Sequence, residues 1–202
     1  MAPRTPLRNP RQYFEAHGFR FGPALAAVGA AVVALAGTLL GFAALFSRRL
    51  ASAGHGDAAD AVWSLVWSEL FGAVLALFVG WLLLAGVLHL IALATLSHDG
   101  SFGETVAVTG WGTAPSVLST LFAFVVLAVA LDGASLTSPE AFAEQFRSTV
   151  ASTGVVRAVV SFLVATWQLY VYDAGLAVAF DTDSALLPAA LVAYGGWLLS
   201  LL

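Results

Sequence analysis

The sequence contains neither cysteine nor lysine, since all eight of its basic residues are arginine. Without cysteine the chain cannot form a disulfide framework, a catalytic thiolate or a sulfur-ligated metal site. The arginine-only basic set and the net charge of −4 are typical of a GC-rich genome. We therefore expect a prokaryotic protein, and the remaining composition indicates its location.

Charged residues of any kind are scarce. They make up 10% of the 202 residues, against 60% hydrophobic residues, and the mean hydropathy is +0.91. Soluble globular domains carry about 25% charged residues, so this composition lies outside their range. It predicts a multi-pass protein of the cell membrane, here a prokaryotic plasma membrane, with the lipid bilayer as its main partner.

The few charges are also excluded from long apolar tracts. A bilayer core of about 30 Å needs about 20 helical residues, so each long tract predicts a membrane-spanning helix. We predict an all-α polytopic bundle, one domain over 22–202, with five spans at about 22–46, 67–96, 104–131, 153–180 and 185–202. The last tract reaches only about 27 Å, but its uncharged end has no polar place to lie. Residues 47–66 are expected to form a loop.

The segment 1–21 precedes the first span and is predicted to lie at the cytoplasmic interface. Basic residues close to the first span hold the N-terminus inside, which with five spans places the C-terminus outside. A cleaved signal peptide is the alternative, but the apolar tract is longer than the usual core of about 7–15 residues. The arginines of this segment are Arg4, Arg8, Arg11 and Arg20.

A short helix is predicted within this segment. Asn9 can cap its first turn, Pro10 suits the first helical position, and Gly18 can end it. Such a helix offers Tyr13 and Phe14 to the headgroup layer as anchors.

Three predicted spans bring polar side chains to one depth. His89 and Asp173 each lie seven residues from the inner end of their spans, about 10 Å deep, and Trp111, Thr113 and Tyr170 share that layer. A carboxylate inside a membrane is costly and marks a candidate functional site. The alternative is that the aspartate is neutral, or that hydrogen bonds to its neighbours satisfy it and hold the helices together.

Pro115 interrupts the third predicted span. Proline lacks the donor that would bond the Trp111 carbonyl, and Gly110 and Gly112 lie just before it. We predict a kink at this point. Transporters use such broken helices as binding sites, but glycine and proline are also common in ordinary membrane helices.

Small residues mark two predicted helix contacts. Gly37 and Gly41 form a GxxxG pair in the first span, which allows close approach of another helix within the chain or between subunits. A second stripe runs along the fourth span at Gly154, Ala158, Ser161 and Ala165.

The sequence lacks the motifs that are typical of catalytic and cofactor-binding sites. The sequence has no nucleophile–base pair, no phosphate-binding loop, no zinc-ligand spacing and no basic nucleic-acid patch. We therefore predict no catalytic residue, metal site, cofactor or nucleic-acid partner.

Several short motifs together resemble the Yip (Ypt-interacting protein) domain family. They cover nearly the whole chain: Asn9-Pro10, Tyr13-Phe14, Gly100–Glu104, Thr109–Pro115, Trp167–Leu169, Gly175-Leu176 and Ser184-Ala185. The resemblance implies a five-helix bundle with a cytoplasmic N-terminus. Eukaryotic members are linked to Rab GTPases and vesicle traffic. This chain lacks their long cytoplasmic N-terminal region, which argues against Rab-type GTPase binding.

Two hypotheses for function follow. The first is a non-enzymatic protein that organises the membrane or binds other membrane proteins, lipids or itself. The alternative is a small transporter or channel subunit that uses the kinked third span and Asp173. A transporter requires a water-accessible cavity that reaches Asp173, whereas an organising protein requires a packed interior and a lateral contact surface.

Overall fold

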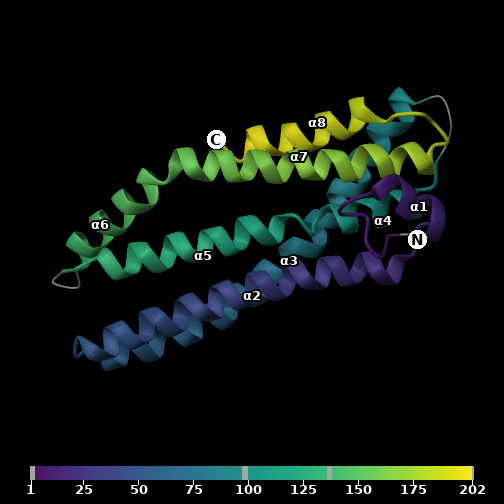
Figure 1. The fold of residues 1–202 in the computed structure, drawn as a ribbon. Helices are drawn as coiled ribbons and strands as arrows, with labels where there is room; N and C mark the ends of the chain where they lie inside the picture. The colour runs from purple at the N-terminus through teal and green to yellow at the C-terminus, as the bar shows by residue number, and fades with distance from the viewer. Residues whose placement is uncertain (1–2, 97–99, 136–137, 202) are drawn as a thin grey trace.

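The computed structural model describes residues 3–96, 100–135 and 138–201, and its regular structure is entirely helical over those ranges (Figure 1). The predicted loop after the second span therefore lies partly outside the described residues, at 97–99, as does the last residue of the predicted fifth span. The helices are α1 Pro10–His17, α2 Phe21–Ser52, α3 Gly56–Thr95, α4 Phe102–Gly112, α5 Ser116–Gly133, α6 Pro139–Ser152, α7 Gly154–Ala179 and α8 Leu186–Leu199.

Helix α1 begins and ends at the residues that its sequence predicts. The Asn9 side chain accepts a hydrogen bond from the Gln12 amide, which satisfies one of the free donors of the first turn. Gly18 ends the helix with a φ of 65°, a conformation that glycine adopts without steric cost.

Helices α2 and α3 form a long hairpin. The segment 47–66 is not the loop expected from the sequence, because only residues 53–55 separate the two helices. The polar residues of this segment led to the loop expectation, yet a helix extends through polar residues once it has left the bilayer. At about 60 Å, α3 is far longer than the bilayer core. The tip of the hairpin lies at the end of the molecule away from α1 (Figure 1), and we expect it to project beyond the apolar layer.

The third predicted span is divided into α4 and α5 at residues 113–115, where Pro115 predicts a kink. Ser101 and Glu104 form a reciprocal capping box at the start of α4. After α5, helix α6 crosses toward α7 and packs on α2, where Phe142 stacks on Phe46 with ring centroids 5.5 Å apart.

Among the described residues, four apolar segments have the length and hydropathy of a membrane span: α2, α3, the combined α4–α5 and α7. The chain is therefore a multi-pass membrane helix bundle. The final tract forms α8, whose 14 residues extend only about 21 Å. α8 runs back along α7, and its Trp197 indole donates to the Ala158 carbonyl. Whether α8 completes a fifth crossing stays a prediction.

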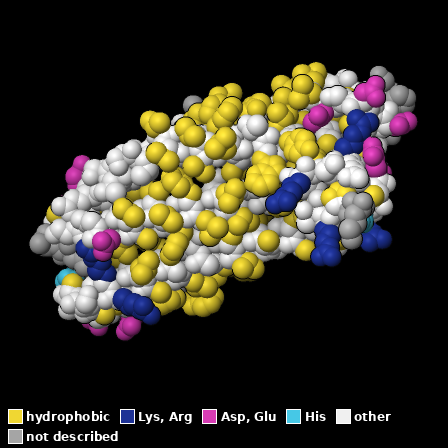
Figure 2. Space-filling view, viewed as in Figure 1, with side chains coloured by type: hydrophobic (Ala, Val, Ile, Leu, Met, Phe, Trp, Pro, Cys, Tyr) yellow, Lys and Arg dark blue, Asp and Glu magenta, His cyan; other side chains and the backbone are white. Residues whose placement is uncertain are grey.

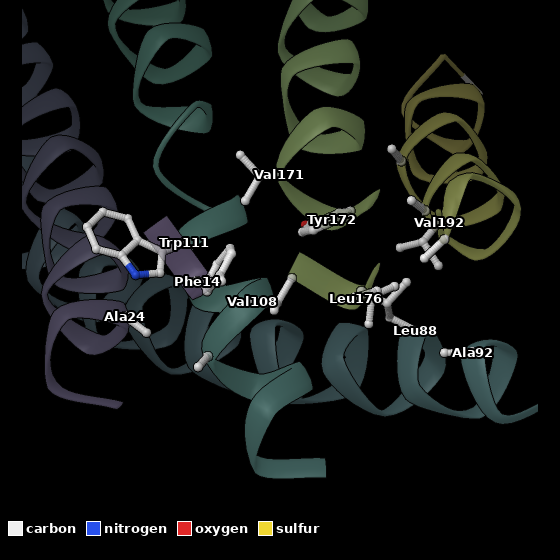
Figure 3. Packing of buried hydrophobic residues seen from close by; sticks show 14 of the residues in the cluster. Phe14, Ala24, Leu88, Ala92, Val108, Trp111, Val171, Tyr172, Leu176 and Val192 are labelled. Atoms are coloured by element: carbon white, nitrogen blue, oxygen red, sulfur yellow. The ribbon is translucent and has the colours of Figure 1, made fainter. Parts of the chain in front are cut away.

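Polar and apolar side chains separate along the molecule. Hydrophobic side chains cover the middle, and most charged side chains gather at the two ends (Figure 2). One end carries α1 and the turn between α7 and α8, and the other carries α6 and the tip of the α2–α3 hairpin (Figure 1). The largest buried cluster lies toward the α1 end, where α1, α3, α4, α7 and α8 meet (Figure 3).

Candidate functional site

The break between α4 and α5 interrupts the regular helical backbone inside the bundle. Five hydrogen bonds of the 3₁₀ type replace the α-helical pattern there. Each runs from a backbone amide to the carbonyl three residues earlier, and the donors are Thr113, Ala114, Ser116, Val117 and Leu118. The Trp111 carbonyl therefore accepts from Ala114 and is not left unpaired by Pro115. These tight turns give hydrogen-bond partners to backbone carbonyls that proline would otherwise leave unpaired.

A side chain from α7 completes the break. The side-chain amide of Gln168 (Nε2) donates a hydrogen bond to the backbone carbonyl of Gly112, at 3.0 Å. In an uninterrupted helix the Ser116 amide would occupy that carbonyl, but here it bonds Thr113 instead. The break is thus held by tertiary contact as well as by its own turns.

Tyr172 lies directly against the same backbone. Its ring occupies the space beside Gly112, where an added Cβ would come within 2.0 Å of a ring carbon. The side chain is only 1% exposed, and its hydroxyl has no hydrogen-bond partner among the described residues. Only glycine at position 112 permits this approach of α7 to the break.

Helix α1 is inserted into the bundle and does not lie flat on its surface. The sequence predicted headgroup anchors at Tyr13 and Phe14, but their exposed fractions are 4% and 1%. The Tyr13 ring meets the Trp111 indole edge to face at 5.6 Å, and Phe14 packs beside Val108 and Gly175 (Figure 3). Both rings exchange a wet interface for the core, which their apolar area favours.

Helix α7 and the following turn fix the N-terminal segment. The Trp167 indole donates to the Leu7 carbonyl at 2.9 Å, and the Tyr170 hydroxyl donates to the Arg8 carbonyl at 3.1 Å. Arg11 donates to the Asp183 carbonyl at 2.8 Å. The predicted site residue Tyr170 therefore contacts the N-terminal segment.

Asp173 receives the start of α8. One of its carboxylate oxygens accepts from the Ala185 amide at 2.7 Å and from the Ser184 hydroxyl at 3.0 Å. A carboxylate at a helix N-terminus satisfies free amides and is favoured by the helix dipole. The geometry gives Asp173 a capping role between two helices.

His89 lies between rings at the start of α4. Its Nδ1 is 3.0 Å from the Thr105 hydroxyl, and its ring approaches Phe102 and Phe180 at 5.5 and 5.9 Å. Its polar partner is therefore Thr105, while Asp173 bonds the start of α8.

The six predicted site residues are His89, Trp111, Thr113, Pro115, Tyr170 and Asp173. They do not form one cluster of bonded groups. Within the described residues, no hydrogen bond or ring contact joins two of them. Sequence reasoning missed the two side chains that contact the break most closely, Gln168 and Tyr172. Their position on α7 gives no local signal, because only the packing of α7 on α4 brings them to Gly112.

The small residues predicted at helix contacts have mixed surroundings. Gly41 faces the Phe124 ring of α5, where an added Cβ would lie 3.0 Å from the nearest ring carbon. An added Cβ at Gly37 or Gly154 meets no atom within 4 Å. On α7, Ala165 is buried and Ser161 lines a cavity of about 280 Å³ against α8.

Comparison with protein families identifies the family of this chain. The family model described as the Yip1 domain matches residues 5–202, which is essentially the whole chain. The chain belongs to the Yip1 domain family. No curated protein and no solved structure matches it. Because the match begins at residue 5, the Yip1 domain of this chain includes α1 together with the long helices.

Proposed function

We propose that this Yip1 domain protein is non-enzymatic and acts by binding other proteins within the membrane. The observation that carries the proposal is a lateral groove between α5 and α7, with a volume of about 370 Å³. The groove lies between α5 and the first two turns of α7, and Val150 of α6 and residues 200 and 201 also line it. We infer that it opens laterally toward the bilayer.

The lining of the groove suits a transmembrane helix. Apolar side chains such as Phe122 and Val126 lie beside small residues such as Ala123 and Ser161, and Arg157 in the first turn of α7 adds one charge. Small residues let two helix backbones approach closely, and hydroxyl groups can bond across the contact. A membrane helix of a partner or of a second copy fits this combination better than a soluble ligand does.

The interior near Asp173 supports binding over transport. The Asp173 carboxylate holds Ala185 and Ser184, and the neighbouring Leu176 and Phe180 are fully buried. Transport through this group would require breaking the start of α8. The lateral groove requires no such rearrangement.

Adjacent valines allow a matched test of the groove. Val126 lines it, whereas Val125 on the same helix is 56% exposed on the outside of the bundle. A photo-crosslinking amino acid at each position, activated in native membranes, should give a protein adduct of defined mass from 126 and none from 125. The same adducts from both positions, or only lipid adducts from 126, would contradict the proposal.

A second candidate, a transporter or channel subunit, has one observation in its favour. The 280 Å³ cavity beside the helix break is lined by several polar side chains, among them Ser116, Ser119, Ser161, Gln168 and Tyr172. A hydrated cavity at a broken helix is a feature of solute pathways. The cavity lies on the α5, α7 and α8 side of the break.

The absence of cysteine makes water access to this cavity simple to measure. In the folded protein, Ser161→Cys should react with a small hydrophilic thiol reagent far more slowly than Gly56→Cys at the exposed tip of the hairpin. Labelling of both positions at similar rates would favour the transporter candidate over the binding proposal.

A further inference from the structure

A pocket of about 490 Å³ lies between the N-terminal segment, the start of α2 and the end of α4. It is separate from the groove between α5 and α7 and shares no lining residue with it. Its lining residues differ in chemistry. We call the polar group Arg4, His17 and Arg20 the rim. We call the apolar group the floor: it comprises Trp111, Ala114 and the α2 alanines, of which Ala27 is buried and Ala26 and Ala30 are exposed.

The rim is electropositive and has no neutralising carboxylate. Arg11 pairs with Glu15, but neither Arg4 nor Arg20 has an ion-pair partner within the described part of the chain. Helix α2 starts at this rim without a side-chain cap, so its first amides and its dipole add to the positive potential. Guanidinium groups and a free helix start together bind phosphate oxygens well.

The floor is apolar and follows the axis of α2 toward the middle of the bundle. Ala26, Ala27 and Ala30 line it over about one and a half turns, and Ala114 faces them from the helix break. The short alanine side chains leave the volume open. An alkyl chain gains by burying itself there, whereas a hydrated inorganic anion does not.

The walls are held in place before any ligand arrives. The hydrogen bond from Trp167 to the Leu7 carbonyl fixes the segment that bears Arg4. The Tyr13 ring stacks on His17 at 4.8 Å and meets Trp111, which joins α1 to the floor. A preformed pocket binds with less loss of conformational entropy.

From this combination we propose that the pocket binds one anionic membrane phospholipid. The phosphodiester lies between Arg4 and Arg20, and the upper part of an acyl chain lies along the alanine floor of α2. Basic pockets between membrane helices recognise lipid headgroups in this way. The net positive rim selects an anionic headgroup such as phosphatidylglycerol over a zwitterionic one such as phosphatidylcholine.

Native mass spectrometry of the full chain, titrated with dioleoyl phosphatidylglycerol or dioleoyl phosphatidylcholine, tests the proposal. We expect the wild type to prefer phosphatidylglycerol by about tenfold. Arg4→Gln with Arg20→Gln should abolish that preference. The matched control, Arg8→Gln with Arg147→Gln, removes the same charge outside the pocket and should keep it.

Two further measurements separate the lipid from other anions and from misfolding. Ala26→Phe fills the floor at an exposed position without changing charge, and it should lower phosphatidylglycerol binding as well. Glycerol 3-phosphate, which carries the phosphate without acyl chains, should not compete. Equal binding of both lipids, equal losses in the control, or full competition by glycerol 3-phosphate would overturn the proposal. Crosslinking from position 126 reports on the α5–α7 groove independently of these results.

Discussion

Single glycines decide how closely the helices of this bundle approach. An added Cβ at Gly112 would meet the Tyr172 ring, and one at Gly175 would come within 2.7 Å of Val108. By contrast, Gly86 in the second half of α3 faces open space. The three positions look alike in the sequence, but alanine is expected to have opposite effects at the first two and at the third.

Gly112→Ala should destabilise the protein by about 1–3 kcal/mol, because the methyl group overlaps a fully buried ring. The matched control is Gly86→Ala, which should be neutral or stabilising by up to about 1 kcal/mol, since it only improves helix propensity. Thermal unfolding in detergent measures both. Equal melting temperatures for the two variants would show that Tyr172 does not occupy this space.

At the scale of elements, the α4–α5 break depends on Pro115 within the break and on Gln168 of α7. Pro115 removes a backbone donor, and Gln168 supplies one to the Gly112 carbonyl from α7. The two contributions belong to one hydrogen-bond arrangement. Their effects on stability should therefore be coupled.

A double-mutant cycle tests this coupling. Gln168→Ala alone should cost about 1–3 kcal/mol by leaving the Gly112 carbonyl unpaired. Pro115→Ala alone should leave stability level or slightly higher, because the restored amide can bond the Trp111 carbonyl. In the Pro115→Ala background, the straightened helix can present the Ser116 amide to Gly112, so Gln168→Ala should cost less. Strict additivity in detergent melting experiments would contradict this account.

Helix α1 offers a pH-dependent test of its own insertion. Burial raises the pKa of the Tyr13 phenol above its usual value of 10.0, and the positive charge of Arg20 partly opposes that rise. Below pH 10 the docked and undocked states both keep the proton, so docking does not depend on pH. As the pH rises above 10, the undocked segment loses its proton first, and docking weakens.

Hydrogen exchange of the α1 amides across pH 9–11, corrected for intrinsic rates, should therefore show protection falling above about pH 10. Tyr13→Phe removes the titrating group and should flatten this dependence while keeping the ring packed against Trp111. If protection falls equally in the variant, another group controls the docking.

Local patterns in the sequence predict the elements better than they predict the contacts between them. The Asn9 and Gly18 caps and the break at Pro115 follow from rules that act within a few residues, and the structure contains each of them. The burial of Tyr13 and the capping of α8 by Asp173 depend on how helices distant in sequence pack together. The position of Asp173 along its span predicts its depth in the membrane but does not predict its hydrogen-bond partners.

At the scale of the whole molecule, the helices differ in length relative to the thickness of the bilayer core. α2 and α3 exceed the apolar core, whereas α8 falls short of it. Most charged side chains gather at the two ends of the molecule, and hydrophobic side chains cover much of the surface between them (Figure 2). The two ends should therefore face different compartments, and the arginines near α1 predict which end is cytoplasmic.

Single cysteines in the cysteine-free chain test this orientation with an impermeant thiol reagent in intact cells. Positions 56 and 140, at the hairpin tip and at the start of α6, should label from outside, and positions 5 and 182 should label only after permeabilisation. Strong labelling of intact cells at position 5 would reverse the orientation. Position 201 reports on α8, because a helix of about 21 Å that begins at the level of Asp173, about 10 Å inside the inner boundary, ends close to the outer boundary of the core and not in open water. We expect position 201 to label more slowly than position 56. Equal rates would mean that the chain end reaches water and that α8 completes a fifth crossing.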